Sequence, residues 1–160
     1  MENLLLNDEY FMKEAIKEAK KALEKDEVPV GAIIVSSGRI IARAHNLTET
    51  LNDVTAHAEM QAITSAGNFL SGKYLNECTL YVTLEPCIMC AGALNWSQLG
   101  TLVFGAYDEK KGYKNLQKNI LHKKTIIKEG VLEAECGSLL TDFFKKKRKS
   151  GINNNPGFEL

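Results

Sequence analysis

The segment from residue 55 to residue 90 begins with Thr-Ala-His-Ala-Glu (55–59) and ends with Pro-Cys-Ile-Met-Cys (86–90). His57, Cys87 and Cys90 are side chains of the kinds that bind zinc, and three protein ligands leave a tetrahedral zinc ion one open position. An open position is typical of catalytic sites, because it holds a water whose pKa falls to roughly 7. Glu59, two residues after His57, is placed to carry a proton from that water. The segment therefore predicts a catalytic metal site.

The same segment predicts how the site is held. Thr55 is a suitable N-cap for a helix beginning at Ala56, and Pro86 suits the first position of a second helix. Cys87 and Cys90 are three residues apart and would share one face of that second helix. A helix N-terminus also lowers the pKa of a thiol, which favours the thiolate that a metal requires. We therefore expect the metal where two helix N-termini converge.

Outward from this segment, helical and strand patterns alternate after an opening hairpin. We expect helices over residues 8–25, 56–66, 86–98 and 133–149, and strands over residues 30–35, 39–44, 79–84, 101–105 and 125–127. Ser37-Gly38 is the turn signal of the hairpin, and residues 46–54 are expected to form a polar loop beside the metal. This order predicts an α/β fold with a central five-stranded mixed sheet and helices on both faces. Residues 1–150 would form a single domain, and residues 151–160 a flexible tail.

The composition is that of an ordinary globular protein, because 44% of the 160 residues are hydrophobic and 25% are charged. The chain contains no apolar run of the roughly 18 residues that a membrane span requires, and its N-terminus lacks a basic segment followed by an apolar one. We therefore expect a cytoplasmic protein without a membrane partner. Four cysteines do not suggest a disulfide framework, and Cys78 and Cys136 are expected to be small core residues.

The formal net charge is zero, but the charges are distributed unevenly along the chain. Residues 1–100 carry 8 Lys and Arg against 13 Asp and Glu, whereas residues 101–150 carry 12 against 6. Such an asymmetry is one mark of a nucleic-acid partner, and it is equally compatible with a solvated helical tail. Charge alone leaves both interpretations open.

The combination of His-x-Glu with Pro-Cys-x-x-Cys resembles the zinc-dependent cytidine/deoxycytidylate deaminase superfamily. The chain is most similar to the bacterial tRNA-specific adenosine deaminases, in segments that include residues 27–32, 80–87 and 142–144. The resemblance implies a three-layer α/β/α cytidine-deaminase-like fold, one Zn²⁺ per chain and a homodimer. It also implies hydrolysis of adenosine to inosine at the wobble position of a tRNA anticodon loop, with Glu59 as the proton carrier and with release of ammonia.

Substrate-binding positions follow from the same resemblance. Asn46 matches an asparagine that hydrogen-bonds the target base, and Asp108 matches an aspartate that contacts the substrate backbone. Val30 and Ala58 are expected beside them. Phe144, from the aromatic pair near the C-terminus, is expected to stack on an unpaired base.

Several alternatives remain beside this interpretation. Trp96, Gln98 and a short segment between Gly112 and Gly130 depart from the tRNA deaminases, and a tryptophan at this place resembles the guanine deaminases, which act on a free base. Trp96 could equally be a core residue. An inactive RNA-binding subunit is disfavoured because Glu59 is present. A redox Cys-x-x-Cys pair explains neither His57 nor Glu59, and a structural zinc site lacks a fourth ligand unless His45 supplies one.

Overall fold

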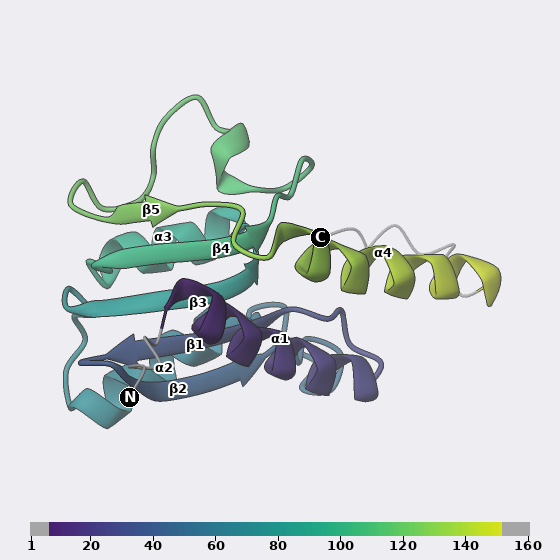
Figure 1. Cartoon of the computed structure of the whole chain (residues 1–160), viewed down its shortest axis with the longest axis horizontal. Coiled ribbons are helices and arrows are strands. Elements are labelled where there is room, and N and C mark those ends of the chain that lie inside the picture. The colour runs from purple at the N-terminus through teal and green to yellow at the C-terminus, as the bar shows by residue number, and fades with distance from the viewer. Residues whose placement is uncertain (1–6, 152–160) are drawn as a thin grey trace, which may run out of the picture.

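The computed structural model describes residues 7–151, in which five strands form one mixed sheet (Figure 1). The strands lie in the order β2-β1-β3-β4-β5. Their bounds are β1 (Gly31–Ser36), β2 (Arg39–His45), β3 (Cys78–Leu84), β4 (Thr101–Ala106) and β5 (Ile126–Lys128). The β1 strand pairs antiparallel with both β2 and β3, whereas β3, β4 and β5 run parallel. The carboxyl ends of β3 and β4 therefore meet at one edge of the sheet, where parallel sheets commonly place ligand sites.

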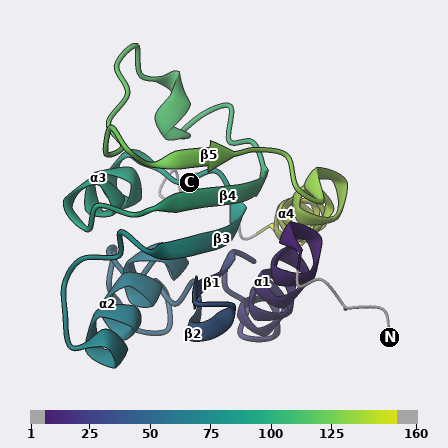
Figure 2. The same ribbon diagram turned by 60° about the vertical axis from the view of Figure 1, so that its left-hand side comes forward.

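Helices cover both faces of this sheet. They are α1 (Asp8–Glu24), α2 (Ala58–Leu70), α3 (Ile88–Trp96) and α4 (Glu133–Lys149), and a short 3₁₀ helix, η1 (Tyr113–Asn115), lies between β4 and β5. Figure 2 shows α1 and α4 on one face and α2 and α3 on the other. The predicted three-layer α/β/α fold with a five-stranded mixed sheet is confirmed.

The α1 helix packs unusually closely on the sheet. Its first turn is capped by Asn7, whose Oδ1 accepts from the amide N–H of Tyr10 at 2.9 Å. Its buried face lies over β1 at Gly31, where an added Cβ would come within 2.1 Å of the Ala15 carbonyl oxygen and 2.4 Å of the Ala19 amide nitrogen. Gly31 is thus required because helix backbone and strand backbone touch at this point.

Two helices begin later than the sequence predicts. The α2 helix begins at Ala58 and not at Ala56, because Thr55 does not cap it: the Thr55 amide and hydroxyl both donate to Asp53 Oδ1, at 2.8 and 2.7 Å. The α3 helix begins at Ile88 and ends at Trp96, so the prediction that Pro86 occupies its first position was wrong. Most of the observed strand ends differ by one residue from the expected ends. The α4 helix has the bounds that the sequence predicts.

The remaining core predictions can also be compared with the structure. Cys78 and Cys136 are buried and free, as expected of core residues. Phe143 is buried, and Phe144 is partly buried against it with the ring centroids 5.3 Å apart. No helix within residues 7–151 has the length and apolar character needed to cross a bilayer. The tail expected after residue 151 lies outside the described residues.

Candidate active site

Three side chains converge at the N-termini of α2 and α3. The Nδ1 atom of His57 lies 3.6 Å from Cys87 Sγ and 3.5 Å from Cys90 Sγ, and all three ligand atoms lie within 4.8 Å of one another. A tetrahedral zinc ion with Zn–S bonds of about 2.3 Å and a Zn–N bond of about 2.0 Å separates sulfur from nitrogen by about 3.6 Å. The donor set and its spacing therefore fit zinc, and three ligands leave a fourth position for water or substrate.

The ligands occupy special positions in their helices. His57 is the N-cap of α2 and Cys87 is the N-cap of α3, and neither makes a side-chain capping hydrogen bond. Cys90 lies one turn into α3, on the side facing Cys87. The amide N–H groups of a helix's first turn lack intrahelical partners and carry partial positive charge, which stabilises a nearby thiolate. The predicted lowering of thiol pKa at the start of α3 is found for Cys87 and not for Cys90.

The two thiols differ in their electrostatics. A hydrogen bond from Cys90, assisted by His57 and opposed by burial, lowers the pKa of Cys87 to about 4. The same thiolate, together with burial, holds the pKa of Cys90 far above its usual range. The hydrogen bond with Cys87 also raises the pKa of His57. Cys87 is therefore a thiolate at neutral pH, ready to bind a cation without first losing a proton.

Glu59 lies in the first turn of α2, beside this donor set. Its side chain is buried, and its carboxylate lies against the Cys90 thiol. Burial raises the pKa of Glu59 to about 7. A carboxyl group whose pKa lies near the working pH can both accept and donate a proton efficiently, which is the requirement for a general acid–base group.

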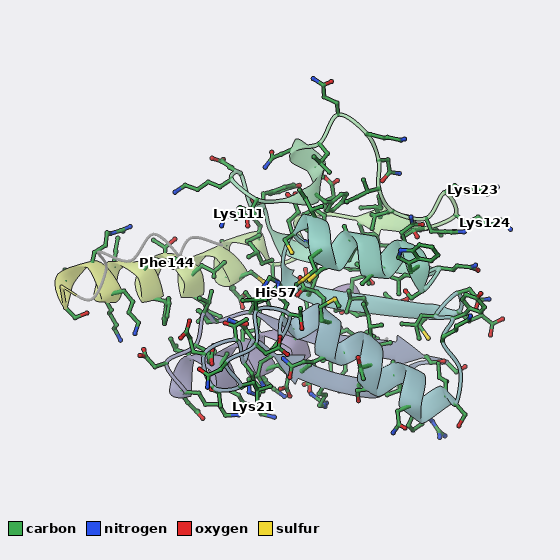
Figure 3. All side chains as sticks on the ribbon, turned by 180° about the vertical axis from the view of Figure 1, so that it is seen from behind. Lys21, His57, Lys111, Lys123, Lys124 and Phe144 are labelled. Carbon is green, nitrogen blue, oxygen red and sulfur yellow. The ribbon has the colours of Figure 1, made fainter. Side chains whose placement is uncertain are left out.

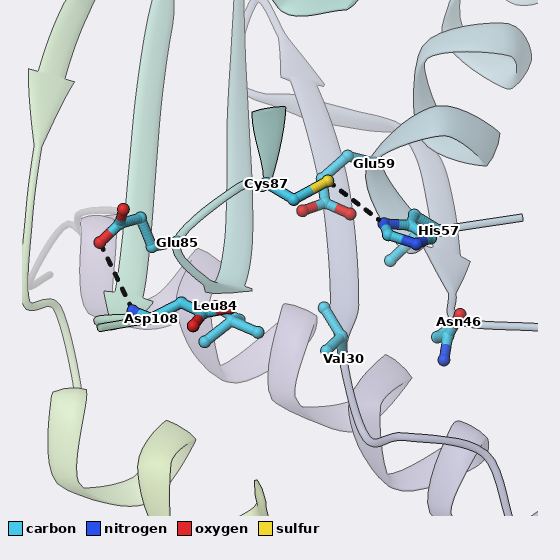
Figure 4. Close-up of a pocket in the computed structure, with 9 residues that line it drawn as sticks. Val30, Asn46, His57, Glu59, Leu84, Glu85, Cys87 and Asp108 are labelled. Atoms are coloured by element: carbon cyan, nitrogen blue, oxygen red, sulfur yellow. Dashed lines mark hydrogen bonds between the residues drawn. The ribbon is translucent and has the colours of Figure 1, made fainter. Parts of the chain in front are cut away.

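A pocket that encloses about 340 Å³ of space, open solvent included, lies next to the donor set (Figure 4). His57, Glu59 and Cys87 line one part of it. Of the other lining residues, Ala58 is the first residue of α2 and Val30 directly precedes β1. The rest lie at the ends of strands or in the loops that follow them: Asn46, Leu84, Glu85 and Asp108. The structure thus brings together at one point four residues that the sequence predicts to bind substrate, Val30, Asn46, Ala58 and Asp108.

Other predicted residues lie elsewhere. Phe144, on α4, does not line this pocket. Trp96 is neither a core residue nor a pocket residue, because 85% of its surface is exposed at the end of α3. The His45 ring lies against Glu18 at 3.1 Å and Lys25 at 3.0 Å, and so is not part of the metal-ligand cluster.

Sequence reasoning missed Leu84 and Glu85. Leu84 is the last residue of β3 and Glu85 comes directly after it, at the edge where the parallel strands end. The signal for Glu85 was present, since a glutamate between a buried strand and a proline is an unusual place for a charge. Its partners come from a loop more than 20 residues away, which no local pattern reveals.

A three-layer α/β/α fold that carries a His/Cys/Cys donor set and a buried glutamate at two helix N-termini defines a deaminase of the cytidine-deaminase-like class. The protein belongs to the MafB19-like deaminase family, whose model matches residues 6–148.

The chain is also similar to individual proteins. The chain is 51% identical over 150 residues to the tRNA-specific adenosine deaminase of Bacillus subtilis, covering 91% of this chain and 93% of that protein. A solved structure from biochemical and structural studies of A-to-I editing by tRNA:A34 deaminases superposes with a TM-score of 0.77 at 42% identity, over 82% of this chain and 99% of the other. The guanine deaminase of Bacillus subtilis superposes with a TM-score of 0.61 at 40% identity, over 63% and 65% of the two chains.

Proposed function

We propose that this protein is a zinc-dependent hydrolytic deaminase that converts adenosine to inosine at wobble position 34 of a tRNA and releases ammonia. The observation that carries the proposal is the complete donor set with Glu59 at one side of a pocket. The similarity to tRNA-specific adenosine deaminases over nine-tenths of the chain supports the choice of substrate.

His57, Cys87 and Cys90 would hold one zinc ion per chain. When bound, such an ion supplies a water acidified to a pKa of about 7. Glu59 would take one proton from the attacking water and deliver it to the ring nitrogen of the base as the new C–O bond forms. It would then pass the remaining hydroxyl proton to the amine, so that the carbonyl forms, the C–N bond breaks and ammonia leaves. Its burial and its raised pKa suit it to carry a proton in both directions.

The pocket walls would hold the extruded base. The Asn46 side chain is almost fully buried, yet its two hydrogen bonds, to the Val28 carbonyl and from the Thr48 amide, are both long at 3.4 Å. Its amide can therefore turn toward a base edge at little cost. Val30 and Ala58 contribute apolar surface, and Asp108 lies at the opposite wall, where it would meet the sugar or backbone of the substrate.

Basic and aromatic side chains outside the pocket support an RNA substrate. In Figure 3, Lys111 and Phe144 both lie toward α4 from His57, whereas Lys123 and Lys124 lie at the opposite end of the molecule. The last turn of α4 adds the run Lys146–Lys149. We infer that the basic groups near α4 contact tRNA phosphates, and that Phe144 stacks on an unpaired base of the anticodon loop.

We also propose a homodimer. The α3 helix exposes 85% of Trp96 and 54% of Ile88, and the loop before α2 exposes 84% of Val54. Contiguous exposed apolar side chains are typical of an interaction surface, and we infer that these three take part in one.

A tRNA substrate would also place the protein in the cytoplasm.

A deamination assay tests the substrate directly. A tRNA stem-loop with adenosine at position 34 is offered beside free guanine, adenine, adenosine and cytidine, and ammonia release is measured. We expect deamination of the stem-loop, with an affinity that falls steeply as the salt concentration rises because phosphate contacts release counterions. Ammonia from guanine, with none from the stem-loop, would refute the tRNA assignment and favour the guanine deaminases as the better functional comparison.

A further inference from the structure

Glu85 is a buried carboxylate that the proposed chemistry does not use. It follows β3 directly and precedes Pro86 and the metal-ligand residue Cys87. Only 4% of its surface is exposed, and its backbone N–H donates to the Ala106 carbonyl at 2.8 Å. This bond fixes its position between the ends of β3 and β4. A buried carboxylate requires hydrogen-bond donors, and the groups that donate to Glu85 indicate its role.

Both donors come from the loop of residues 107–116, whose Asp108 lines the pocket. The Asp108 amide N–H donates to Glu85 Oε1 at 3.4 Å, and the Lys114 amide N–H donates to Oε2 at 3.2 Å. Figure 4 shows the carboxylate of Glu85 directed at Asp108. The two oxygens thus hold the two ends of the loop.

The rest of the loop wraps closely around this carboxylate. A Cβ added at Gly112 would lie closer than 2 Å to Glu85 Oε2, so a side chain there would displace the carboxylate. Gly112 forms an isolated β-bridge with Cys87, and the Tyr113 amide N–H donates to the Pro86 carbonyl at 2.9 Å. The loop is therefore attached to the three residues 85–87 as one unit.

Asp108 takes its position from this arrangement. Its Oδ1 accepts the amide N–H groups of Lys110 and Lys111, at 3.1 and 3.0 Å, so its side chain is ordered within the loop. Glu85 holds Asp108 and Lys114, and together with the attachments of Gly112 and Tyr113 it sets the location of the loop relative to Cys87.

We propose that Glu85 is a positioning residue that holds Asp108 and the 107–116 loop at a set distance from the Cys87 ligand. The proposal rests on the proposed function only in treating Asp108 as a substrate-contacting residue. Under this proposal, Glu85 affects substrate binding indirectly, by fixing the position of the 107–116 loop. The metal-binding and substrate-binding parts of the site would then move together.

Glu85→Gln tests the proposal, because a glutamine has nearly the same shape but turns an N–H₂ group toward one of the two backbone N–H groups. We expect zinc content to stay at that of the unmodified protein and kcat to change little, while KM for the stem-loop rises about tenfold. Hydrogen exchange at the amides of residues 108–114 should become faster. Glu77→Gln is the matched control, since Glu77 is exposed just before β3, and it should change none of these quantities.

A double-mutant cycle separates positioning from direct contact. In an Asp108→Ala background, Glu85→Gln should raise KM no further, because its effect acts through Asp108; an additive increase would overturn the proposal. Gly112→Ala should reproduce the KM and exchange changes of Glu85→Gln, because its Cβ displaces the same carboxylate.

The exchange measurement does not depend on the substrate. If the stem-loop is not deaminated at all, the proposed function fails while the loop attachment is still judged by exchange. If exchange of residues 108–114 is unchanged in Glu85→Gln, the positioning role fails whatever the substrate.

Discussion

Replacing Gly31 by alanine should destabilise the protein through a contact between two backbones. The new Cβ would lie 2.1 Å from the Ala15 carbonyl oxygen and 2.4 Å from the Ala19 amide nitrogen. Backbone atoms cannot rotate away, so α1 would have to withdraw from β1 by about 1 Å, which places the change among overpacked cores that cost about 1–3 kcal/mol.

The magnitude follows from the size of the required movement. Withdrawal of α1 loosens Met12, Ala15 and Ala19, all of which are fully buried, so we expect a value near the upper end of that range. Alanine also reduces the entropy of the unfolded chain, which returns about 0.4–1 kcal/mol. A net loss of about 2–2.6 kcal/mol should lower the Tm by about 4–10 °C for a domain of this size.

Thermal unfolding followed by circular dichroism measures this shift. The control is Gly137→Ala, in the middle of α4, where the added Cβ would meet only the Ala106 Cβ at an ordinary 3.9 Å. That substitution should raise stability by about 0.5–1 kcal/mol, because alanine is the better helix former. An unchanged or raised Tm for Gly31→Ala would refute the close helix–strand contact.

Two further predictions concern the site and the pH dependence of stability. Cys87→Ala should lose the zinc that elemental analysis finds in the unmodified protein, whereas Glu59→Ala should retain it and lower turnover by about 10²–10⁴-fold; zinc loss from Glu59→Ala would show that Glu59 is a ligand. The hydrogen bond from Lys17, with help from Arg43 and against the effect of burial, holds the pKa of Glu14 below its usual range. A depressed carboxyl pKa stabilises the fold at neutral pH and ceases to do so as the pH falls through it. Glu14→Gln should therefore lower the free energy of unfolding measured in urea at pH 7 by at most about 1 kcal/mol, and should match the unmodified protein in acid.

The sequence was sufficient for the donor set because its chemistry is local. His-x-Glu and Pro-Cys-x-x-Cys each place their residues on one helix start, and the alternation of strands and helices then leaves few ways to bring the two starts together. The α4 helix was predicted with its observed bounds because its apolar spacing is regular.

The sequence-based predictions failed where the environment of a side chain depends on more than its residue type. Thr55 is a good N-cap by type, but Asp53 lies two residues before it and takes both of its donors. Trp96 was assigned to the core as one alternative because large aromatics are usually covered, and its exposure depends on the direction of the last turn of α3. Glu85 could not be interpreted from sequence because its role depends on amides of residues 108 and 114.

The N-cap positions of His57 and Cys87 also bear on how the protein matures. Serine, threonine, aspartate or asparagine at such a position stabilises a helix by about 1 kcal/mol, and here both helices lack that contribution from their cap side chains. An ion held by His57 and Cys87 would join two helix starts separated by 30 residues, and it would stabilise the folded chain because the unfolded chain has no preformed site for it. A newly synthesised chain would therefore gain its final resistance to proteolysis only on metal loading, and zinc starvation would leave it vulnerable at the starts of α2 and α3.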